Sequence, residues 1–158
     1  MKTLELRRWA VIGPGAIGLY YGGRIANTGR SLSVLARSDL NALVRDGIQI
    51  MMVDAESKDI LDRIQVPLET VSEDPRQLGL VDCVIVAAKT IVNNDLIETL
   101  SHIVEPGHTV ILSLQNGMGN AEFFGRHFPN NPILAGLCFV CVNRTRPGCV
   151  ENYHPGRV

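Results

Sequence analysis

The chain has 158 residues, a length typical of one domain that can bury a sizeable core without metal or disulfide cross-links. Its 16 acidic and 15 basic residues nearly cancel and are scattered, so the sequence lacks the basic cluster by which proteins bind nucleic acid or an anionic membrane. No apolar run reaches the roughly 18 residues of a membrane span, and the run at 9–12 is too short for a signal-peptide core. We therefore expect a cytoplasmic protein with no nucleic-acid or membrane partner and with small molecules as ligands.

Short apolar runs alternate with segments of helical pattern along most of the chain. Strands are expected at 8–13, 32–36, 81–88 and 109–114, and helices at 15–28, 38–47 and 91–104. Such alternation predicts parallel strands with crossover helices, which is the plan of an open α/β sheet. The runs at 81–88 and 109–114 are nearly all apolar, as expected for strands in a sheet with helices on both faces.

Two regions of strand character lie outside this alternation. Between Ile48 and Val66, two β-rich pieces surround a polar centre, which predicts a hairpin. The segment 132–158 has the pattern of further strands, joined by a turn at Pro147-Gly148. We expect both regions to form extra β segments beside the α/β sheet.

The four cysteines of the chain are expected to be reduced, because no secretory leader precedes them. Cys138 and Cys141 have the spacing of a zinc or redox pair, but both fall in one expected strand, 133–142, where positions three apart face opposite sides of the sheet. We therefore predict no metal site. The alternative is a zinc or redox centre built from Cys138, Cys141, Cys149 and His154. The four histidines show no spacing typical of a metal site or a catalytic triad.

The stretch "VIGPGAIG" at 11–18 places three glycines after the first expected strand and at the start of the first expected helix. This is the context that a dinucleotide-binding fingerprint requires. Gly13 would permit a tight turn, Gly15 the close approach of a diphosphate to main-chain N–H groups, and Gly18 the packing of helix on strand. Gly22 and Ala26 continue a smooth helix stripe that begins at Gly18. The candidate cofactor-binding residues of this loop are Gly13, Pro14, Gly15, Ala16, Ile17 and Gly18.

The end of the second expected strand indicates which nicotinamide coenzyme is favoured. An NAD-binding chain would carry Asp or Glu about 20 residues past the glycine loop, to bind the ribose 2′-hydroxyl. Here Arg37 and Ser38 occupy that place. A carboxylate would repel a 2′-phosphate, whereas arginine offers it a planar fork of donors. We therefore predict NADP, bound by Arg37 and Ser38; the alternative is that the strand ends later and Asp39 reaches the ribose.

Polar residues follow two of the apolar strands directly. Lys89 and Thr90 come after 81–88, and Gln115, Asn116 and Gly117 come after 109–114. In an open α/β sheet, ligands bind beyond the carboxyl ends of the strands. Lys89 could hold a carboxylate or ribose hydroxyls, and the Asn116 amide could orient a carbonyl or the nicotinamide ribose. The alternatives are a surface lysine at a helix start and a turn-forming asparagine before Gly117.

Together, "VIGPGAIG" at 11–18, Arg37, "VIVAAKT" at 84–90 and "LQNGMG" at 114–119 resemble the N-terminal NADP-binding domain of the ketopantoate reductases, which are 2-dehydropantoate 2-reductases of pantothenate biosynthesis. The resemblance covers essentially the whole chain. It implies a Rossmann-type, open and mostly parallel sheet over residues 1–158. It also implies hydride transfer from NADPH to the ketone of a 2-oxo acid, with Lys89 and Asn116 in positioning roles at the catalytic centre.

In that family the general acid, a lysine, and its acidic partner lie in a second, mostly helical domain, which we expect to be absent from this chain. Physical reasoning agrees, since ketone reduction needs a proton donor near the developing alkoxide and Lys89 is the only obvious candidate. We therefore expect the chain alone to bind NADPH but to turn over poorly or not at all. Alternatives are a related NADP-dependent reductase of another substrate and a non-catalytic NADPH-binding module. The sequence leaves homodimer formation open.

Overall fold

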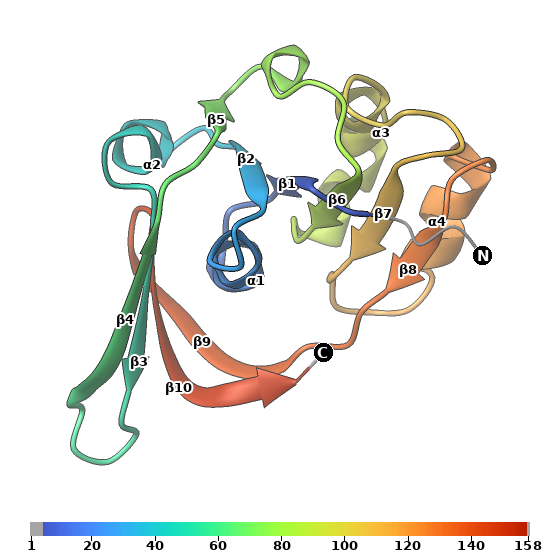
Figure 1. Cartoon of the computed structure of the whole chain (residues 1–158). Helices are drawn as coiled ribbons and strands as arrows, with labels where there is room; N and C mark the ends of the chain where they lie inside the picture. The colour runs from blue at the N-terminus through green and yellow to red at the C-terminus, as the bar shows by residue number, and fades with distance from the viewer. Residues whose placement is uncertain (1–4, 158) are drawn as a thin grey trace.

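A computed structural model of the chain describes the backbone of residues 5–157 and the side chains of residues 5–153. Its centre is a six-stranded sheet of order β5-β2-β1-β6-β7-β8 (Figure 1), in which every pair of neighbours is parallel. The strands are β1 (Arg8–Ile12), β2 (Ser31–Leu35), β5 (Thr70–Ser72), β6 (Cys83–Val86), β7 (Val110–Ser113) and β8 (Ile133–Ala135). The chain runs outward from β1 to β5 and then returns to β6, so the winding direction reverses between β1 and β6. The predicted α/β sheet is confirmed.

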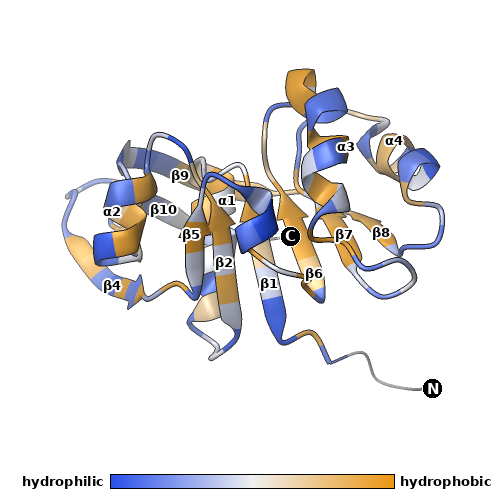
Figure 2. Cartoon of the chain, turned by 90° about the horizontal axis from the view of Figure 1, so that it is seen from above, coloured by the Kyte–Doolittle hydropathy of each residue, from blue (hydrophilic) through white to orange (hydrophobic). Residues whose placement is uncertain are grey.

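Helices cover both faces of this sheet, as predicted. They are α1 (Ala16–Ala26), α2 (Leu40–Asp46), α3 (Asn93–Ser101) and α4 (Asn120–His127), with short 3₁₀ turns at Pro75–Gln77 and Thr90–Val92. One buried cluster contains side chains of α1 and another contains those of α3 and α4, and the two share no residue. The hydropathy of the elements explains this layering (Figure 2). Strands β6 and β7 are hydrophobic along most of their length, whereas α2 and α4 have both hydrophobic and hydrophilic residues. Within residues 5–157, no helix has the length and apolar character needed to cross a membrane.

A second sheet has the order β4-β3-β10-β9 and is formed by two hairpins. The predicted hairpin of β3 (Ile48–Val53) and β4 (Ile60–Val66) is confirmed, and so is the turn at Pro147-Gly148 between β9 (Phe139–Arg146) and β10 (Cys149–Arg157). The sequence did not predict that β10 pairs in parallel with β3. The single strand expected at 133–142 is wrong. It is divided into β8, which belongs to the large sheet, and the start of β9, which belongs to the small one.

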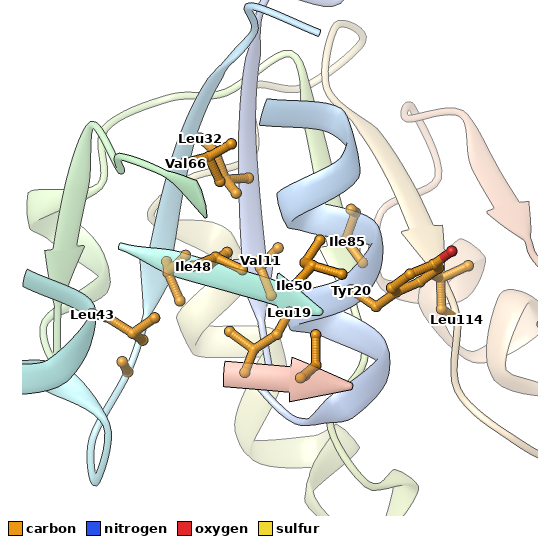
Figure 3. Packing of buried hydrophobic residues seen from close by; sticks show 13 residues of the cluster. Val11, Leu19, Tyr20, Leu32, Leu43, Ile48, Ile50, Val66, Ile85 and Leu114 are labelled. Atoms are coloured by element: carbon orange, nitrogen blue, oxygen red, sulfur yellow. The ribbon is translucent and has the colours of Figure 1, made fainter. Parts of the chain in front are cut away.

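Helix α1 lies between the two sheets. A Cβ added at Gly22 would meet Val11 of β1 at 2.7 Å, and one added at Gly23 would meet Ile50 of β3 at 2.8 Å. Figure 3 shows Ile48 and Ile50 of β3 beside α1, in the same cluster as Val11 of the large sheet. Gly22 and Gly23 therefore let the two sheets pack closely against two sides of α1. This packing fixes the position of the helix and of the glycine loop that precedes it.

Asp82, a buried residue just before β6, connects several segments at the end of the sheet opposite the glycine loop. Its carboxylate accepts hydrogen bonds from the backbone N–H groups of Arg7 and Arg8 at 2.9 and 2.8 Å and from Nη2 of Arg8 at 2.9 Å, and it lies 3.1 Å from Nε2 of His108. Burial would raise the pKa of Asp82, but the hydrogen bonds from Arg8, His108 and Arg7 outweigh it and hold the pKa well below its usual range. One carboxylate thus connects β1, β6 and the turn before β7.

Candidate functional site

A cleft lies at the carboxyl edge of the large sheet, where the winding direction reverses. It consists of two adjoining hollows of about 400 and 340 Å³ that share Ala87, Ala88 and Lys89 after β6. The first hollow is also lined by the loops after β1 and β2, by α3 and by β9, and the second by the loop after β7. This is the place at which doubly wound sheets bind their ligands.

The glycine loop forms the floor between β1 and α1. Gly13 has φ +91°, and a Cβ there would lie 2.4 Å from the backbone nitrogen of Ala88. The Gly15 N–H donates to the Gly13 carbonyl at 2.8 Å, which closes the turn. A Cβ at Gly18 would lie 2.3 Å from the same carbonyl oxygen, so the predicted close packing of helix, loop and strand is confirmed. Gly15 differs from both, because no atom beyond its two chain neighbours lies within 4 Å of the place where its Cβ would be.

The first turn of α1 is suited to an anion. Its N–H groups have no intrahelical acceptors, and the positive end of the helix dipole points toward the cleft. The first turn holds no acidic residue, and no side chain caps it, because the N-cap residue is Gly15. Gly13, Pro14 and Gly15 line the first hollow and Ile17 lines the second. Ala16 is half-buried as the first residue of α1, and Gly18 is buried beneath the loop.

The residues after β2 lie at one wall of the first hollow. Arg37 and Ser38 are exposed and line it. Among the described residues, the Arg37 guanidinium has no hydrogen-bond or ion-pair partner. Strand β2 ends at Leu35, and the Asp39 side chain is 2% exposed and lines neither hollow. The alternative in which Asp39 reaches a ribose in the cleft is therefore not supported.

Lys89 and Asn116 are brought to the second hollow from neighbouring strands, as the sequence predicted. Lys89 also lines the first hollow, so it lies at the junction of the two. Both residues are exposed, and Lys89 makes no ion pair with the part of the chain that the structure describes. The arrangement places one exposed cation and one amide beside the same space.

A partly buried amide network, centred on the buried side chain of Asn93, supports the two loops that carry Lys89 and Asn116. Nε2 of Gln115 donates to the Ala88 carbonyl at 2.8 Å and to Oδ1 of Asn93 at 2.7 Å. Nδ2 of Asn93 donates to Oδ1 of Asn120 at 3.2 Å, and Nδ2 of Asn120 lies 3.2 Å from the Asn116 carbonyl, to which it donates. The network therefore fixes the distance between the loop after β6 and the loop after β7.

Sequence reasoning missed two parts of the cleft. One face of α3, with Asp95, Leu96 and Thr99, forms a wall of the first hollow, and the amphipathic pattern of this helix could have suggested such a face. Arg144 of β9 also lines the first hollow and pairs with Asp39, with Nη1 of the arginine 2.8 Å from Oδ2 of the carboxylate. No local sequence signal connects these two residues, which are 105 positions apart.

The four cysteines are free thiols, but Cys138 and Cys141 do not lie in one strand as expected. Cys138 precedes β9, whereas Cys141 lies within it, so the argument from alternating strand faces does not apply. Burial raises the pKa of Cys138, which is half-buried beside Tyr21. Among the described residues, no three His, Cys, Asp or Glu side chains are placed to hold a metal ion, and the side chain of His154 lies outside the described part.

Comparison with known proteins gives one consistent result. A model of the family "Ketopantoate reductase PanE/ApbA" matches residues 9–158. The 2-dehydropantoate 2-reductase of Nostoc sp. is 32% identical over 152 residues, which cover 96% of this chain and 45% of that protein. The crystal structure of 2-dehydropantoate 2-reductase from Geobacter metallireducens matches with a TM-score of 0.82 and 34% identity. The match covers 94% of this chain and 47% of the Geobacter chain. The corresponding enzyme of Methylococcus capsulatus has a TM-score of 0.81 and 31% identity, with coverages of 95% and 46%.

The chain thus spans about half the length of the curated relatives it matches. The match extends through the glycine loop, the Arg37 wall and the loops that carry Lys89 and Asn116, which are the segments on which the resemblance in sequence depends. Because the family model covers nearly all of the chain, this protein belongs to the ketopantoate reductase PanE/ApbA family.

Proposed function

We propose that residues 1–158 are the dinucleotide-binding domain of a reductase that uses NADPH to reduce a 2-oxo acid, 2-dehydropantoate, by hydride transfer. The observation that carries the proposal is the open space over Gly15, which faces the first hollow at the N-terminus of α1. It lies at the reversal point of the sheet, and a diphosphate is the ligand for which such a helix start is suited. The relatives named 2-dehydropantoate 2-reductase support the substrate class.

The residues of the first hollow fit the adenosine half of NADPH. The guanidinium of Arg37 suits its 2′-phosphate, with Ser38 beside it at the same wall, and the bare main chain at Gly15 suits its diphosphate. The lining of Ile12, Leu35, Val92 and Leu96 offers apolar surface to a base. A carboxylate within reach of the ribose would favour NAD, but Asp39 is buried away from the hollow. These residues together favour NADPH over NADH.

The second hollow fits the reacting end. NADPH, when bound, supplies the hydride. Lys89 can hold the ribose hydroxyls or the substrate carboxylate from the junction of the two hollows, and the Asn116 amide can orient a carbonyl oxygen beside it. Ile17, Ile91 and Leu114 offer apolar surface to the nicotinamide ring at this space.

The proton that the product hydroxyl requires is a separate matter. Among the described residues, Lys89 is the only titratable side chain that lines the second hollow, and it is exposed. A proton donor works best when it is held at the developing alkoxide in a space closed to water. We therefore assign Lys89 a positioning role and not that of the general acid.

The test is a calorimetric titration of the 158-residue chain with NADPH and with NADH. Arg37→Ala should weaken NADPH binding about 10- to 160-fold, the equivalent of a charged hydrogen bond of about 1.5–3 kcal/mol, and leave NADH binding nearly unchanged. The matched control is Arg45→Ala, since Arg45 pairs with Asp46 on α2 and lines neither hollow. Equal losses for the two coenzymes would contradict the assignment of Arg37. Failure of the folded wild-type chain to bind either coenzyme would contradict the proposed function.

A further inference from the structure

Two arginines from different sheets border the first hollow. Arg37 comes from the loop after β2 of the large sheet, and Arg144 comes from β9 of the small one. The charged side chains that line this hollow are Arg37, Lys89, Arg144 and Asp95, so cations outnumber carboxylates by three to one. Such a wall attracts a ligand group that carries more than one negative charge.

Asp39 holds Arg144 at this wall. Its buried carboxylate accepts hydrogen bonds from Ser38 Oγ at 3.0 Å, from Arg144 Nη1 at 2.8 Å and from the Gly148 N–H at 3.3 Å. A buried carboxylate requires partners of this kind, because an unpaired charge away from water is costly. The Gly148 contact also fixes the β9–β10 turn, and with it the strand that carries Arg144.

Arg144 keeps donors for a ligand while it is paired with Asp39. A guanidinium has five N–H donors, and the Asp39 contact uses only Nη1. The Arg144 side chain is 40% exposed and lines the same hollow as Arg37 and Ser38. The guanidinium is therefore held by Asp39 through Nη1, and its other donors remain open to the cleft. Because the side chain is already ordered, binding an anion would cost less conformational entropy.

We propose that Arg144 is a second ligand of the 2′-phosphate of NADPH, opposite Arg37, and that Asp39 is the positioning residue that holds it there. This inference rests on the proposed function, because it names a further selectivity residue of the same site. A phosphate with nearly two negative charges is matched by two guanidinium groups better than by one. An acidic residue at the position of Asp39 would indicate NAD binding if it faced the ribose. Here Asp39 instead supports NADP binding indirectly, through Arg144.

The primary test is the ratio of NADPH to NADH affinity in Arg144→Gln. We expect NADPH binding to weaken at least 10-fold and NADH binding to change less than about twofold, because only NADPH carries the 2′-phosphate. Adenosine 2′,5′-bisphosphate and 5′-AMP serve as probes of the same difference without the nicotinamide. The control is Arg146→Gln on the same strand, because Nη2 of Arg146 donates to Oε1 of Gln49 at 2.8 Å and the residue lines neither hollow. Arg144→Lys should recover part of the ratio, since it keeps the charge and loses the fork.

The role of Asp39 is tested by a double-mutant cycle. Asp39→Asn should lower the NADPH-to-NADH affinity ratio in the wild-type background and leave it unchanged in the Arg144→Gln background, because Asp39 acts through Arg144. If Asp39→Asn fails to fold, Arg144→Gln and Arg144→Lys decide the inference alone. An unchanged ratio in Arg144→Gln, in a chain whose wild type binds NADPH, would overturn the inference and leave the proposed function standing. Absence of coenzyme binding to the wild type would overturn both.

Discussion

Two alanine substitutions in one turn should separate the folding role of the glycine loop from its binding role. Gly15→Ala and Gly18→Ala each add a single methyl group, three residues apart, to the same turn of chain. At Gly15 the methyl group would enter open space over the first hollow, whereas at Gly18 it would lie 2.3 Å from the Gly13 carbonyl oxygen. We expect the first substitution to weaken coenzyme binding strongly and the second to destabilise the fold.

The expected change in stability is small at Gly15. Its backbone angles, φ −79° and ψ −168°, are open to alanine, so the reduced freedom of the unfolded chain stabilises the protein by about 0.4–1 kcal/mol. Alanine is a poorer N-cap residue than glycine by a similar amount. The two effects nearly cancel, and the melting temperature should move by less than about 4 °C.

Gly18 should behave differently because its neighbours cannot move. Alanine gains about 1 kcal/mol of helix propensity, but overpacking typically costs about 1–3 kcal/mol, and here the clash involves a backbone oxygen. Val11 Cγ1 lies 3.0 Å away on the other side, and Gly13 is itself pressed against Ala88. We expect a net loss of about 1–2 kcal/mol, which corresponds to a melting temperature lower by roughly 2–8 °C.

The assay is thermal unfolding followed by circular dichroism, together with calorimetric titration of NADPH. Gly15→Ala should lose about 3 kcal/mol of binding free energy, more than 100-fold in affinity, because the methyl group keeps the diphosphate from the helix N–H groups. NADH should be affected as strongly, since both coenzymes carry the diphosphate. Wild-type affinity in a folded Gly15→Ala chain would refute the placement of the diphosphate at this loop.

Three further predictions concern other parts of the fold. Because the pKa of Asp82 is depressed in the folded state, its stabilising effect is complete above the unfolded pKa of about 3.9 and is lost as the pH falls toward the folded value. Asp82→Asn should thus cost about 2 kcal/mol at neutral pH and flatten the acid limb of a stability profile measured with urea. Asn93→Ala should lower the free energy of unfolding by about 1–2 kcal/mol and weaken NADPH binding, since the Asn93 amide connects the loops of the second hollow. A lower melting temperature with unchanged NADPH affinity would limit Asn93 to a structural role. At about pH 8 a thiol reagent should label exposed Cys141 quickly and Cys83 only after unfolding, because burial raises the pKa of Cys83 to about 12; mass spectrometry of labelled peptides gives the order.

The parts of the fold that were predicted are those with local causes. The glycine loop combines a strand, a tight turn and a helix start within eight residues, and Gly13 has the positive φ that only glycine adopts readily. The strands β6 and β7 are apolar along their length because both faces are covered, which is a pattern of the strand itself. Lys89 and Asn116 line the same hollow because the carboxyl ends of neighbouring parallel strands lie at one edge.

The parts that were not predicted depend on pairing between distant segments. The hairpins of β3–β4 and β9–β10 were each visible, but their union into one sheet depends on a parallel pairing across about a hundred residues. Strand β5 has three residues, and its edge position leaves a weak pattern. Gly23 looked like an ordinary helix position, yet it is the place where the second sheet approaches α1.

Asp39 shows why residue type and position in the sequence do not settle coenzyme choice. The rule that an acidic residue near the end of the second strand indicates NAD assumes that its carboxylate faces the ribose. Here the carboxylate is turned away and satisfied by Arg144 and the β9–β10 turn, and these partners exist only after the small sheet has formed. An exposed carboxylate at this position would make the cleft more negative. Buried Asp39 has the opposite effect, because it keeps Arg144 at the wall of the first hollow while its own charge stays away from the cleft. We therefore predict that the coenzyme selectivity of this chain depends on both sheets, so that substitutions in β9 or in the turn at 147–148 alter it without touching the glycine loop.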